Sequence, residues 1–384
     1  PIQRVVDQVA AYFVPTVMIL GIAAFIVWYN VGPEPRIVFS IIVFVTTLII
    51  ACPCALGLAT PTSLTVGIGK GAENGILIRS GDALQTAKRL NAIVLDKTGT
   101  ITKGEPALTD VITLGQIPEN DLLALTAALE KGSEHPLGEA IVRGAEDRHL
   151  VLATAVDFAA IPGHGVYGRV DGHEILLGNA KLLRDRGIDS ADLTGNWESL
   201  AADGKTPMYV AVDGKAAGLI AVADTIKDDS VVAVKSLQKM GLEVVMITGD
   251  NARTADAIAK RAGIERVLAD VLPQEKAHQV KKLQLEGKVV AMVGDGINDA
   301  PALAQADVGM AIGTGTDVAI EASDITLIKG SLTGVVTAIQ ISSATMRNVR
   351  QNLFGAFIYN VLGVPVAMGV MYPFSGLLLS PLIA

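Results

Sequence analysis

Long apolar segments occur near both ends of the chain and are separated by a polar middle. The first two cover residues 9–28 and 37–58, and each is close to the ~20 residues that a helix needs to cross a bilayer. A third covers residues 354–371, and a fourth, at 376–384, is too short for a full span. The pattern predicts a multi-pass integral membrane protein whose last helix is incomplete, so we expect a fragment of a longer chain.

Basic residues next to these segments predict the orientation of the chain in the membrane. They lie on the side that carries the polar middle: Lys70, Arg79, Lys88, Arg89, Arg347 and Arg350. Such residues are enriched on the cytoplasmic side of membranes, so we expect the polar middle in the cytoplasm. The start of the chain does not read as a secretory signal, because it carries Arg4 and Asp7 and no cleavage pattern.

The polar middle, residues 91–330, alternates short aliphatic runs with amphipathic stretches. This alternation predicts a parallel sheet flanked by helices. Strands are expected at residues 92–95, 242–247 and 289–293, and each is followed by a loop rich in Asp, Gly and Thr. Ligands collect beyond the carboxyl ends of parallel strands, so the three loops are expected to form one site.

A block between the first and second of these strands has turns and strands of its own. We expect it to form a separate α+β domain inserted into the sheet domain. The predicted fold is therefore multidomain α/β with added transmembrane α-helices. Its expected parts are a membrane and stalk region at 1–88 and 333–384, a parallel-sheet domain at 89–105 and 219–332, and the inserted domain at 106–218.

Composition agrees with a mixed membrane and soluble chain. The 384 residues are 50% hydrophobic, with a mean hydropathy of +0.46, which is too apolar for an ordinary soluble enzyme. The net charge of -8 offers no basic surface for phosphates, so nucleic acid is not an expected partner. Only two cysteines occur, Cys52 and Cys54, which is too few and too closely spaced for a disulfide framework.

Groups suited to phosphoryl transfer follow each expected strand. Asp96 comes directly after the first strand, where its carboxylate can attack a phosphoryl group. Thr248 follows the second strand, and Lys276 supplies an ammonium group that would offset phosphate charge. Asp295 follows the third strand, where Mg2+ could bridge it to Asp96 and the phosphate. One such loop alone reads as an ordinary turn, whereas three in this order indicate a catalytic site.

The strings Asp96–Thr100, Thr248–Asn251 and Gly294–Pro301 resemble the P-type ATPases of the haloacid dehalogenase superfamily. The resemblance implies a haloacid-dehalogenase-like phosphorylation domain with an inserted nucleotide-binding domain, phosphorylated by ATP on Asp96. The catalytic residues it implies are Asp96, Lys97, Thr98, Thr100, Thr248, Gly249, Asp250, Lys276, Asn298 and Asp299. The implied ligands of Mg2+ are Asp96, Thr98 and Asp295.

The inserted block carries two short motifs that are weak when taken singly. Ser133–Leu137 reads as the entry of a helix, and Pro162–Gly168 fits a loose glycine pattern without the strand-turn-helix setting of a dinucleotide fold. Together they resemble the nucleotide-binding domain of heavy-metal P-type ATPases. The resemblance implies that ATP is contacted by Glu134, His135, Gly163, Gly165, Gly178 and Asn179.

Cys52 and Cys54 flank a proline within an apolar span. Pro53 removes a backbone hydrogen bond and kinks a helix there, and soft sulfur ligands favour Cu+, with Zn2+ as the main competitor. A structural proline kink with two buried thiols is the alternative interpretation. The spacing of this motif ahead of Asp96 resembles heavy-metal P-type pumps, in which it forms part of the transport site.

The choice of metal depends on Tyr359 and Asn360 in the third span. The pair resembles the copper branch of the family, whereas zinc and cadmium pumps usually carry a lysine in this helix, and no lysine follows Lys329. An interfacial tyrosine beside a capping asparagine is the structural alternative. The resemblance therefore implies Cu+ or Ag+ as cargo, with Cys52, Cys54, Tyr359 and Asn360 among its ligands.

The expected function is ATP-driven transport of Cu+ or Ag+, in the export direction, at a bacterial plasma membrane. Expected partners are ATP, membrane lipid and the soft metal ion, delivered by a metallochaperone. A zinc or cadmium pump, a membrane-anchored phosphatase and a metal-binding protein with an inert sheet domain are the alternatives. The actuator loop and amino-terminal Cys-x-x-Cys domains of the family do not occur in this sequence, so we expect phosphorylation with poor release of the phosphate.

Overall fold

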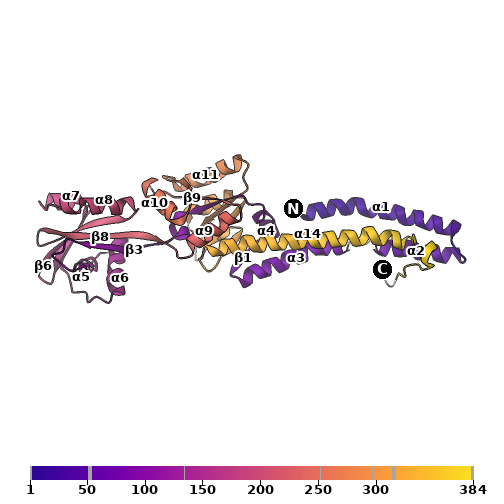
Figure 1. Cartoon of the computed structure of the whole chain (residues 1–384), viewed down its shortest axis with the longest axis horizontal. Helices are drawn as coiled ribbons and strands as arrows, with labels where there is room; N and C mark the ends of the chain where they lie inside the picture. The colour runs from indigo at the N-terminus through magenta and orange to yellow at the C-terminus, as the bar shows by residue number, and fades with distance from the viewer. Residues whose placement is uncertain are drawn as a thin grey trace. The chain divides into compact units, whose positions relative to one another are not determined.

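A computed structural model describes residues 2–50, 54–133, 135–250, 252–295, 297–313 and 317–381, with the backbone only at residues 2–7, 54–56, 297 and 317. The chain divides into two compact units (Figure 1). Unit 1 contains residues 1–89 and 337–384, and unit 2 contains residues 90–336. The expected site loops and the expected inserted domain all belong to unit 2.

Unit 2 contains a parallel sheet in which the strands follow the order β13-β12-β11-β2-β9-β10. The strands are β2 (Ala92–Asp96), β9 (Glu243–Ile247), β10 (Arg266–Leu268), β11 (Val290–Gly294), β12 (Val308–Ile312) and β13 (Ile325–Leu327). The helices around them are α9 (Ser230–Lys239), α10 (Ala252–Ala262), α11 (Pro273–Leu285), α12 (Ala300–Gln305) and α13 (Asp317–Ala322). The three strands expected from the sequence are β2, β9 and β11, and they lie side by side.

Burial explains why these strands read as continuous apolar runs. Every residue of β2 and β11 is buried, as is usual for parallel strands covered on both faces. Residues of the strands and of α11 and α12 share one core, which includes Val94, Val245, Leu283, Met292 and Leu303. The packed core fixes the ends of the three central strands at one edge of the sheet.

A second sheet of six antiparallel strands follows the order β3-β8-β7-β6-β5-β4. The strands are β3 (Thr102–Thr113), β4 (Val156–Ile161), β5 (Gly165–Val170), β6 (His173–Gly178), β7 (Thr206–Val212) and β8 (Lys215–Ile226). The helices α5 (Glu119–Glu130) and α6 (Pro136–Asp147) cover one face, and α7 (Ala180–Asp185) and α8 (Thr194–Ala202) cover the other (Figure 1). The expected boundaries of the insert, 106 and 218, fall inside β3 and β8, the pair of long strands that joins the two sheets.

Unit 1 is mainly helical. Its elements are α1 (Ile2–Val31), α2 (Arg36–Ile50), α3 (Cys54–Glu73), β1 (Ile76–Ile78), α4 (Gly81–Ala87), most of α14 (Thr333–Ala367) and α15 (Tyr372–Ser375). Among the described residues, one helix, at 8–31, is both long and apolar enough to cross a membrane, and α2 is a shorter apolar helix. Of the expected span at 37–58, residues 37–50 lie in α2 and residues 54–58 in α3, and residues 51–53 lie outside the described residues.

The expectation of a helix at residues 376–384 is wrong for the part that is described. The short helix α15 ends at Ser375, and Gly376 adopts a left-handed backbone with φ of 67°, a conformation that commonly ends helices. Residues 376–381 contain no helix. The third expected span, 354–371, is also shorter than predicted, because α14 ends at Ala367.

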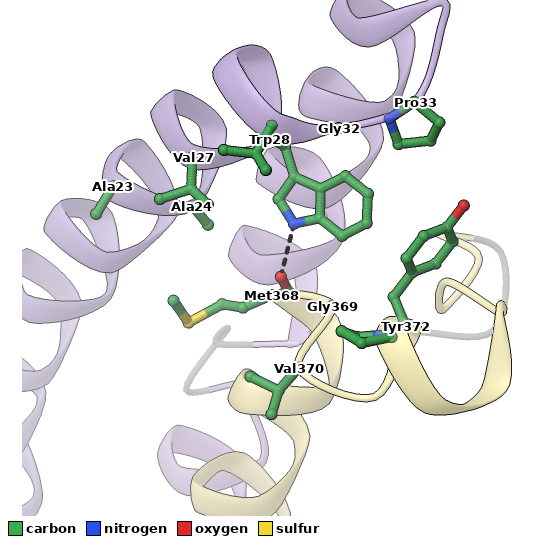
Figure 2. Close-up of a pocket in the computed structure, with 12 residues that line it drawn as sticks. Ala23, Ala24, Val27, Trp28, Gly32, Pro33, Met368, Gly369, Val370 and Tyr372 are labelled. Atoms are coloured by element: carbon green, nitrogen blue, oxygen red, sulfur yellow. Dashed lines mark hydrogen bonds between the residues drawn. The ribbon is translucent and has the colours of Figure 1, made fainter.

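Trp28, near the carboxyl end of α1, contacts the chain directly after the carboxyl end of α14. The indole Nε1 of Trp28 donates a hydrogen bond of 3.0 Å to the carbonyl oxygen of Met368 (Figure 2). Tyr372 meets the same indole edge-on, with 5.0 Å between ring centroids. An apolar cavity of about 430 Å³ lies between these residues. The aromatic contacts hold the ends of the first and last long helices of unit 1 together.

Candidate active site

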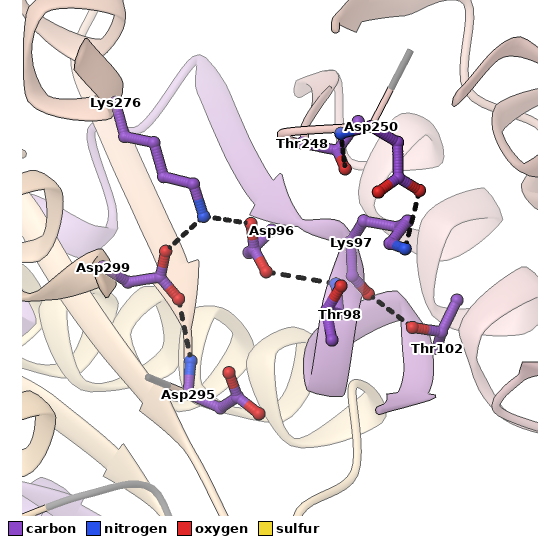
Figure 3. Close-up of polar contacts among 9 residues, drawn as sticks. All are labelled: Asp96, Lys97, Thr98, Thr102, Thr248, Asp250, Lys276, Asp295 and Asp299. Carbon is purple, nitrogen blue, oxygen red and sulfur yellow. Dashed lines mark hydrogen bonds and ion pairs between the residues drawn. The ribbon is translucent and has the colours of Figure 1, made fainter. Parts of the chain in front are cut away.

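Asp96 stands at the carboxyl end of the buried strand β2. Asp96 is only 5% exposed, and the backbone N–H of Thr98 donates a hydrogen bond of 3.1 Å to its Oδ2 atom (Figure 3). The chain then turns through residues 97–101, where Gly99 has a φ of 71°. A carboxylate held in this way has one oxygen oriented by the turn and the other directed toward neighbouring loops.

Lys276 lies in the first turn of α11 and points at this second oxygen. Its Nζ atom is 2.6 Å from Asp96 Oδ1 and 2.7 Å from Asp299 Oδ1 (Figure 3). Burial alone would lower the pKa of Lys276, but the two carboxylates raise it above its ordinary value. Lys276 is therefore a cation throughout the physiological range, placed to offset negative charge beside Asp96.

Three carboxyl groups gather at the ends of β2 and β11. Asp96, Asp295 and Asp299 offer oxygen atoms that all lie within 4.8 Å of one another. Burial and, after it, the neighbouring Asp299 carboxylate raise the pKa of Asp96 to about 7 against the opposing effect of Lys276. The pKa of Asp295 is raised by burial and by Asp299. Crowded carboxylates with raised pKa values are what a hard divalent cation such as Mg2+ relieves, so these oxygens fit that ion.

The structure thus brings the expected Mg2+ ligands together and adds Asp299 to them. Asp96 and Asp295 belong to the carboxylate group, and Thr98 lies beside Asp96 in the turn. Asp299, which the resemblance implied as a catalytic residue but not as a ligand of Mg2+, joins the group, and its Oδ2 atom accepts a hydrogen bond from the backbone N–H of Asp295 at 3.3 Å. Asn298, in the short helix Ile297–Asp299, is exposed.

The loop after β9 meets the same site. The hydroxyl of Thr248 accepts a hydrogen bond of 3.1 Å from the backbone N–H of Asp250, and the Asp250 carboxylate forms an ion pair of 2.8 Å with Lys97 (Figure 3). Gly249 lies between them. Thr100 is fully buried, and its hydroxyl has no hydrogen-bond partner among the described residues. Asn251 and Gly296, within the strings that carried the resemblance, lie outside the described residues.

Two residues that the sequence did not single out hold the turn after Asp96. The Nζ atom of Lys227 donates hydrogen bonds to the carbonyl oxygens of Gly99 and Gly330. The Asp224 carboxylate accepts hydrogen bonds from the hydroxyl of Thr102 at 2.5 Å and from a backbone N–H at 2.9 Å. Asp224 lies near the end of β8, and Lys227 comes directly after that strand. The sequence signal that could have identified them is the string Asp224–Lys227, where the chain returns from the inserted domain to the parallel sheet.

A second cavity, of about 900 Å³, lies on the antiparallel sheet and contains most of the expected nucleotide contacts. A Cβ atom at Gly165 would collide with the carbonyl oxygen of Leu177, so only glycine fits there. Asn179 donates a hydrogen bond of 2.9 Å from its Nδ2 atom to the carbonyl oxygen of Gly163. The structure therefore brings together four expected residues at the adjacent ends of β5 and β6: Gly163, Gly165, Gly178 and Asn179.

His135 lines the same cavity from the start of α6. Its Nδ1 atom accepts a hydrogen bond of 3.2 Å from the backbone N–H of Leu137 and so caps the helix. The neutral ring therefore carries its proton on Nε2. Glu134, the remaining expected ATP contact, lies outside the described residues.

Glu130 is a lining residue of this cavity that the sequence did not reveal. Its side chain is 6% exposed, and its Oε2 atom has no hydrogen-bond partner among the described residues. Burial raises the pKa of Glu130, against the opposing effects of Ser133 and His135. Buried polar atoms are nearly always paired, so an unpaired carboxyl oxygen at the wall of a cavity marks a position suited to a ligand.

The expected ligands of the transported metal are described only in part. Cys52 lies outside the described residues, and Cys54 is described as the first backbone residue of α3. Tyr359 and Asn360 both lie on α14, where Tyr359 is 55% exposed and Asn360 is 7% exposed. A buried asparagine within an apolar helix segment is unusual enough to indicate a polar task.

Comparisons with known proteins agree with the geometry of the site around Asp96. The family model of haloacid dehalogenase-like hydrolases matches residues 90–307. A probable copper-transporting ATPase, PacS, of Synechococcus elongatus is 56% identical over all of this chain and 51% of its own length. A copper-transporting P-type ATPase of Rhizobium leguminosarum is 53% identical, and a silver exporting P-type ATPase of Salmonella typhimurium is 49% identical, over 46% and 47% of their lengths.

Solved structures give the same result. A zinc-transporting PIB-type ATPase in its E2.Pi state superposes with a TM-score of 0.82 at 36% identity, covering 94% of this chain and 59% of that one. The chain spans about half the length of the curated relatives it matches. The matched family model covers more than half of the chain and contains Asp96, Lys276 and Asp295. The chain therefore belongs to the haloacid dehalogenase-like hydrolases, and within them to the P-type ATPases.

Proposed function

We propose that the chain is the catalytic part of an ATP-driven pump that exports Cu+ or Ag+ through an aspartyl phosphate on Asp96. The observation that carries the proposal is the buried Asp96 carboxylate with Lys276 at 2.6 Å and two further carboxylates beside it. A carboxylate oxygen of Asp96 attacks the γ-phosphorus of ATP, and the new O–P bond forms as the bond to the bridging oxygen breaks. ADP leaves with that electron pair.

The residues around Asp96 have distinct proposed roles in this step. Lys276 offsets the negative charge of the transferred group, and the N–H of Thr98 orients the attacking carboxylate. Thr248 offers its hydroxyl to the phosphoryl oxygens. When Mg2+ is bound by Asp96, Asp295 and Asp299, it neutralises phosphate charge. Together these groups favour transfer to Asp96 over transfer to water.

The cavity on the antiparallel sheet is the proposed ATP site, within a nucleotide-binding domain at residues 106–218. Gly163 and Gly165 allow the backbone to approach a ligand closely, and Glu130 and His135 offer polar groups at the wall. A solved catalytic domain of a CPx-ATPase, described in terms of nucleotide binding, resembles the chain with a TM-score of 0.53 at 26% identity and supports this assignment.

The proposed cargo site consists of Cys52, Cys54, Tyr359 and Asn360. Two sulfur ligands favour a soft monovalent ion, and the relatives named as copper or silver transporters share about half of the residues of this chain. We place the protein in a bacterial plasma membrane, with unit 2 in the cytoplasm, membrane lipid around unit 1 and a metallochaperone as the donor of the ion. The direction of transport is export.

Labelling tests the proposed chemistry. With ATP radiolabelled at the γ-phosphate and Mg2+, the chain is expected to acquire label that hydroxylamine releases, as it does from acyl phosphates. Asp96→Asn is expected to abolish this label. The matched control is Asp147→Asn, which alters an exposed carboxylate at the end of α6. Equal labelling of Asp96→Asn and of the parent would refute the proposal.

The choice of ion is tested with protein expressed from the complete gene. Cu+ or Ag+ is expected to stimulate ATP turnover, and Cys54→Ser is expected to abolish the stimulation. Stimulation by Zn2+ alone would make the protein a zinc pump, as in the zinc-transporting structural relative. ATP turnover that is independent of every metal and unchanged in Cys54→Ser would indicate a membrane-anchored phosphatase.

A further inference from the structure

The helices α3 and α14 contact each other closely at two successive levels of unit 1. At the first level, a Cβ atom added to Gly67 would collide with the side chain of Thr345. The helices can therefore approach this closely only because residue 67 has no side chain. At the second level, one turn along each helix, Ser63 of α3 meets Asn348 and Asn352 of α14. A tight backbone contact is thus followed directly by a polar one.

The polar contact is a closed set of hydrogen bonds. The Nδ2 atom of Asn352 donates to Ser63 Oγ at 3.1 Å and to Asn348 Oδ1 at 3.0 Å, which uses both of its protons. The single hydroxyl proton of Ser63 is shared between Asn348 Oδ1 at 2.9 Å and the carbonyl oxygen of Ala59 at 2.7 Å. Ser63 is 7% exposed. We call Ser63, Asn348 and Asn352 the interhelical clasp.

The order of the contacts fixes the relative direction of the two helices. Along α3 the residue number falls from Gly67 to Ser63, while along α14 it rises from Thr345 to Asn352. The helices are therefore antiparallel. A third contact continues the series beyond α3, because a Cβ atom at Gly363 would lie 3.0 Å from Ile50.

This register has a consequence for the proposed cargo site. Cys54 lies nine residues before Ser63, and Asn360 lies eight residues after Asn352. At a rise of ~1.5 Å per residue, position 54 is about 14 Å along α3 from Ser63 and position 360 is about 12 Å along α14 from Asn352, in the same direction. The start of α3 and Asn360 therefore lie at the same depth in unit 1.

We propose that the interhelical clasp sets the register of α3 against α14 and thereby the spacing of the cargo ligands that the two helices carry. The inference rests on the proposed function, because it needs Cys54 and Asn360 to bind the ion. Ser63, Asn348 and Asn352 are positioning residues and do not touch the ion. A slip of either helix would separate the ligands without altering Asp96 or its neighbours, which belong to unit 2.

The test measures metal dependence separately from maximal activity. In protein from the complete gene, Ser63→Ala and Asn352→Ala are expected to raise the Cu+ concentration for half-maximal phosphorylation about threefold to fifteenfold, the range of interhelical hydrogen bonds. The level of phosphorylation at saturating Cu+ should stay unchanged. Ser63→Thr retains the hydroxyl and should restore the parent value. Gln351→Ala, at the exposed neighbour of Asn352, is the matched control.

A double-mutant cycle and a ligand variant complete the experiment. Ser63→Ala combined with Asn352→Ala should be no worse than Ser63→Ala alone, because Ser63→Ala already removes both hydrogen bonds between the helices. The inference is wrong if each clasp variant leaves the Cu+ dependence unchanged while Asn360→Ala weakens it. If Asn360→Ala and Cys54→Ser also leave it unchanged, the proposed cargo site itself is wrong. Equal loss of maximal phosphorylation and thermal stability in the clasp variants would reduce the clasp to a general structural role.

Discussion

At the scale of single residues, Glu130 combines two properties that conflict in the absence of a ligand. It is nearly fully buried, yet one carboxyl oxygen has no hydrogen-bond partner among the described residues. Burial accordingly raises its pKa. Natural proteins retain such unpaired polar groups mainly where they are used, and Glu130 is one of the residues that line the proposed ATP cavity.

The variant Glu130→Gln allows the effect of Glu130 on protein stability and its effect on ATP binding to be measured separately. Because the pKa of Glu130 is higher in the folded than in the unfolded state, ionisation of Glu130 destabilises the folded protein. This destabilisation is absent below the pKa of the unfolded state and grows as the pH rises through the pKa of the folded state. The variant should therefore melt at a higher temperature than the parent at pH 8, and at a similar temperature at pH 4.5. Thermal scans without nucleotide measure this difference.

The same variant should bind ATP about threefold to tenfold more weakly in calorimetric titrations, since it loses an acceptor suited to a ligand donor. Glu139→Gln, an exposed neighbour on α6, serves as control. Unchanged ATP affinity in Glu130→Gln would remove Glu130 from the site.

Lys276 is the one cation that contacts both Asp96 and Asp299 among the described ion pairs. Lys276→Met leaves these two buried carboxylates without their counter-charge, so we expect it to abolish phosphorylation and to lower the free energy of unfolding by about 3 kcal/mol. Combining it with Asp96→Asn should recover part of that stability, because one of the opposed charges is removed. Urea denaturation measures both values, and a double variant less stable than Lys276→Met would contradict the account.

At the scale of elements, the turn after β2 depends on a single glycine. Gly99 has a positive φ, and a Cβ atom there would collide with the carboxylate of Asp295. The turn can therefore bring Asp96 and Asp295 together only because residue 99 has no side chain. Lys227 supports the same turn through the Gly99 carbonyl oxygen.

Gly99→Ala should reduce phosphorylation at least tenfold, since misplacement of reacting groups by about 1 Å is costly. Gly115→Ala is a close control, because Gly115 also has a positive φ but faces open space. Initial rates of phosphoenzyme formation compare the two variants. A rate for Gly99→Ala as high as that for Gly115→Ala would contradict the role given to the contact between residue 99 and Asp295.

The elements of the sheet could be predicted from the sequence more readily than their surroundings. The strands β2, β9 and β11 are continuous apolar runs followed by Asp, Gly and Thr, so both the strands and the convergence of their loops followed from local pattern. Asp96, Lys276 and Asp295 were identified in this way, and the structure groups them.

Residues defined by distant contacts could not be predicted in this way. Glu130 ends an ordinary amphipathic helix, and only the packing of α5 shows that its carboxyl group is buried. Lys227 reads as a surface lysine until the sheet brings it to the turn. The apolar composition of residues 376–381 suggested a helix, whereas Gly376 ends α15 and no helix follows in the described residues.

At the scale of the whole molecule, two kinds of chemistry occur in separate units of one chain. Unit 2 contains the carboxylate group and the proposed ATP cavity, and unit 1 contains the buried Asn360 and the interhelical clasp. The division between the units falls inside α14, whose first residues belong to unit 2. A pump requires both kinds of chemistry, whereas a soluble phosphatase requires only the first.

The most direct measurement locates the phosphoryl group in the chain. Acid-quenched phosphoenzyme, formed from ATP and Mg2+, is reduced with borohydride, which converts an aspartyl phosphate to homoserine, and is then digested and sequenced by mass spectrometry. The account predicts homoserine at position 96, in the peptide that continues through Lys97, and its absence when ATP is omitted. Homoserine at Asp250, Asp295 or Asp299 instead, or a phosphorylated hydroxyl residue with Asp96 intact, would contradict the central claim.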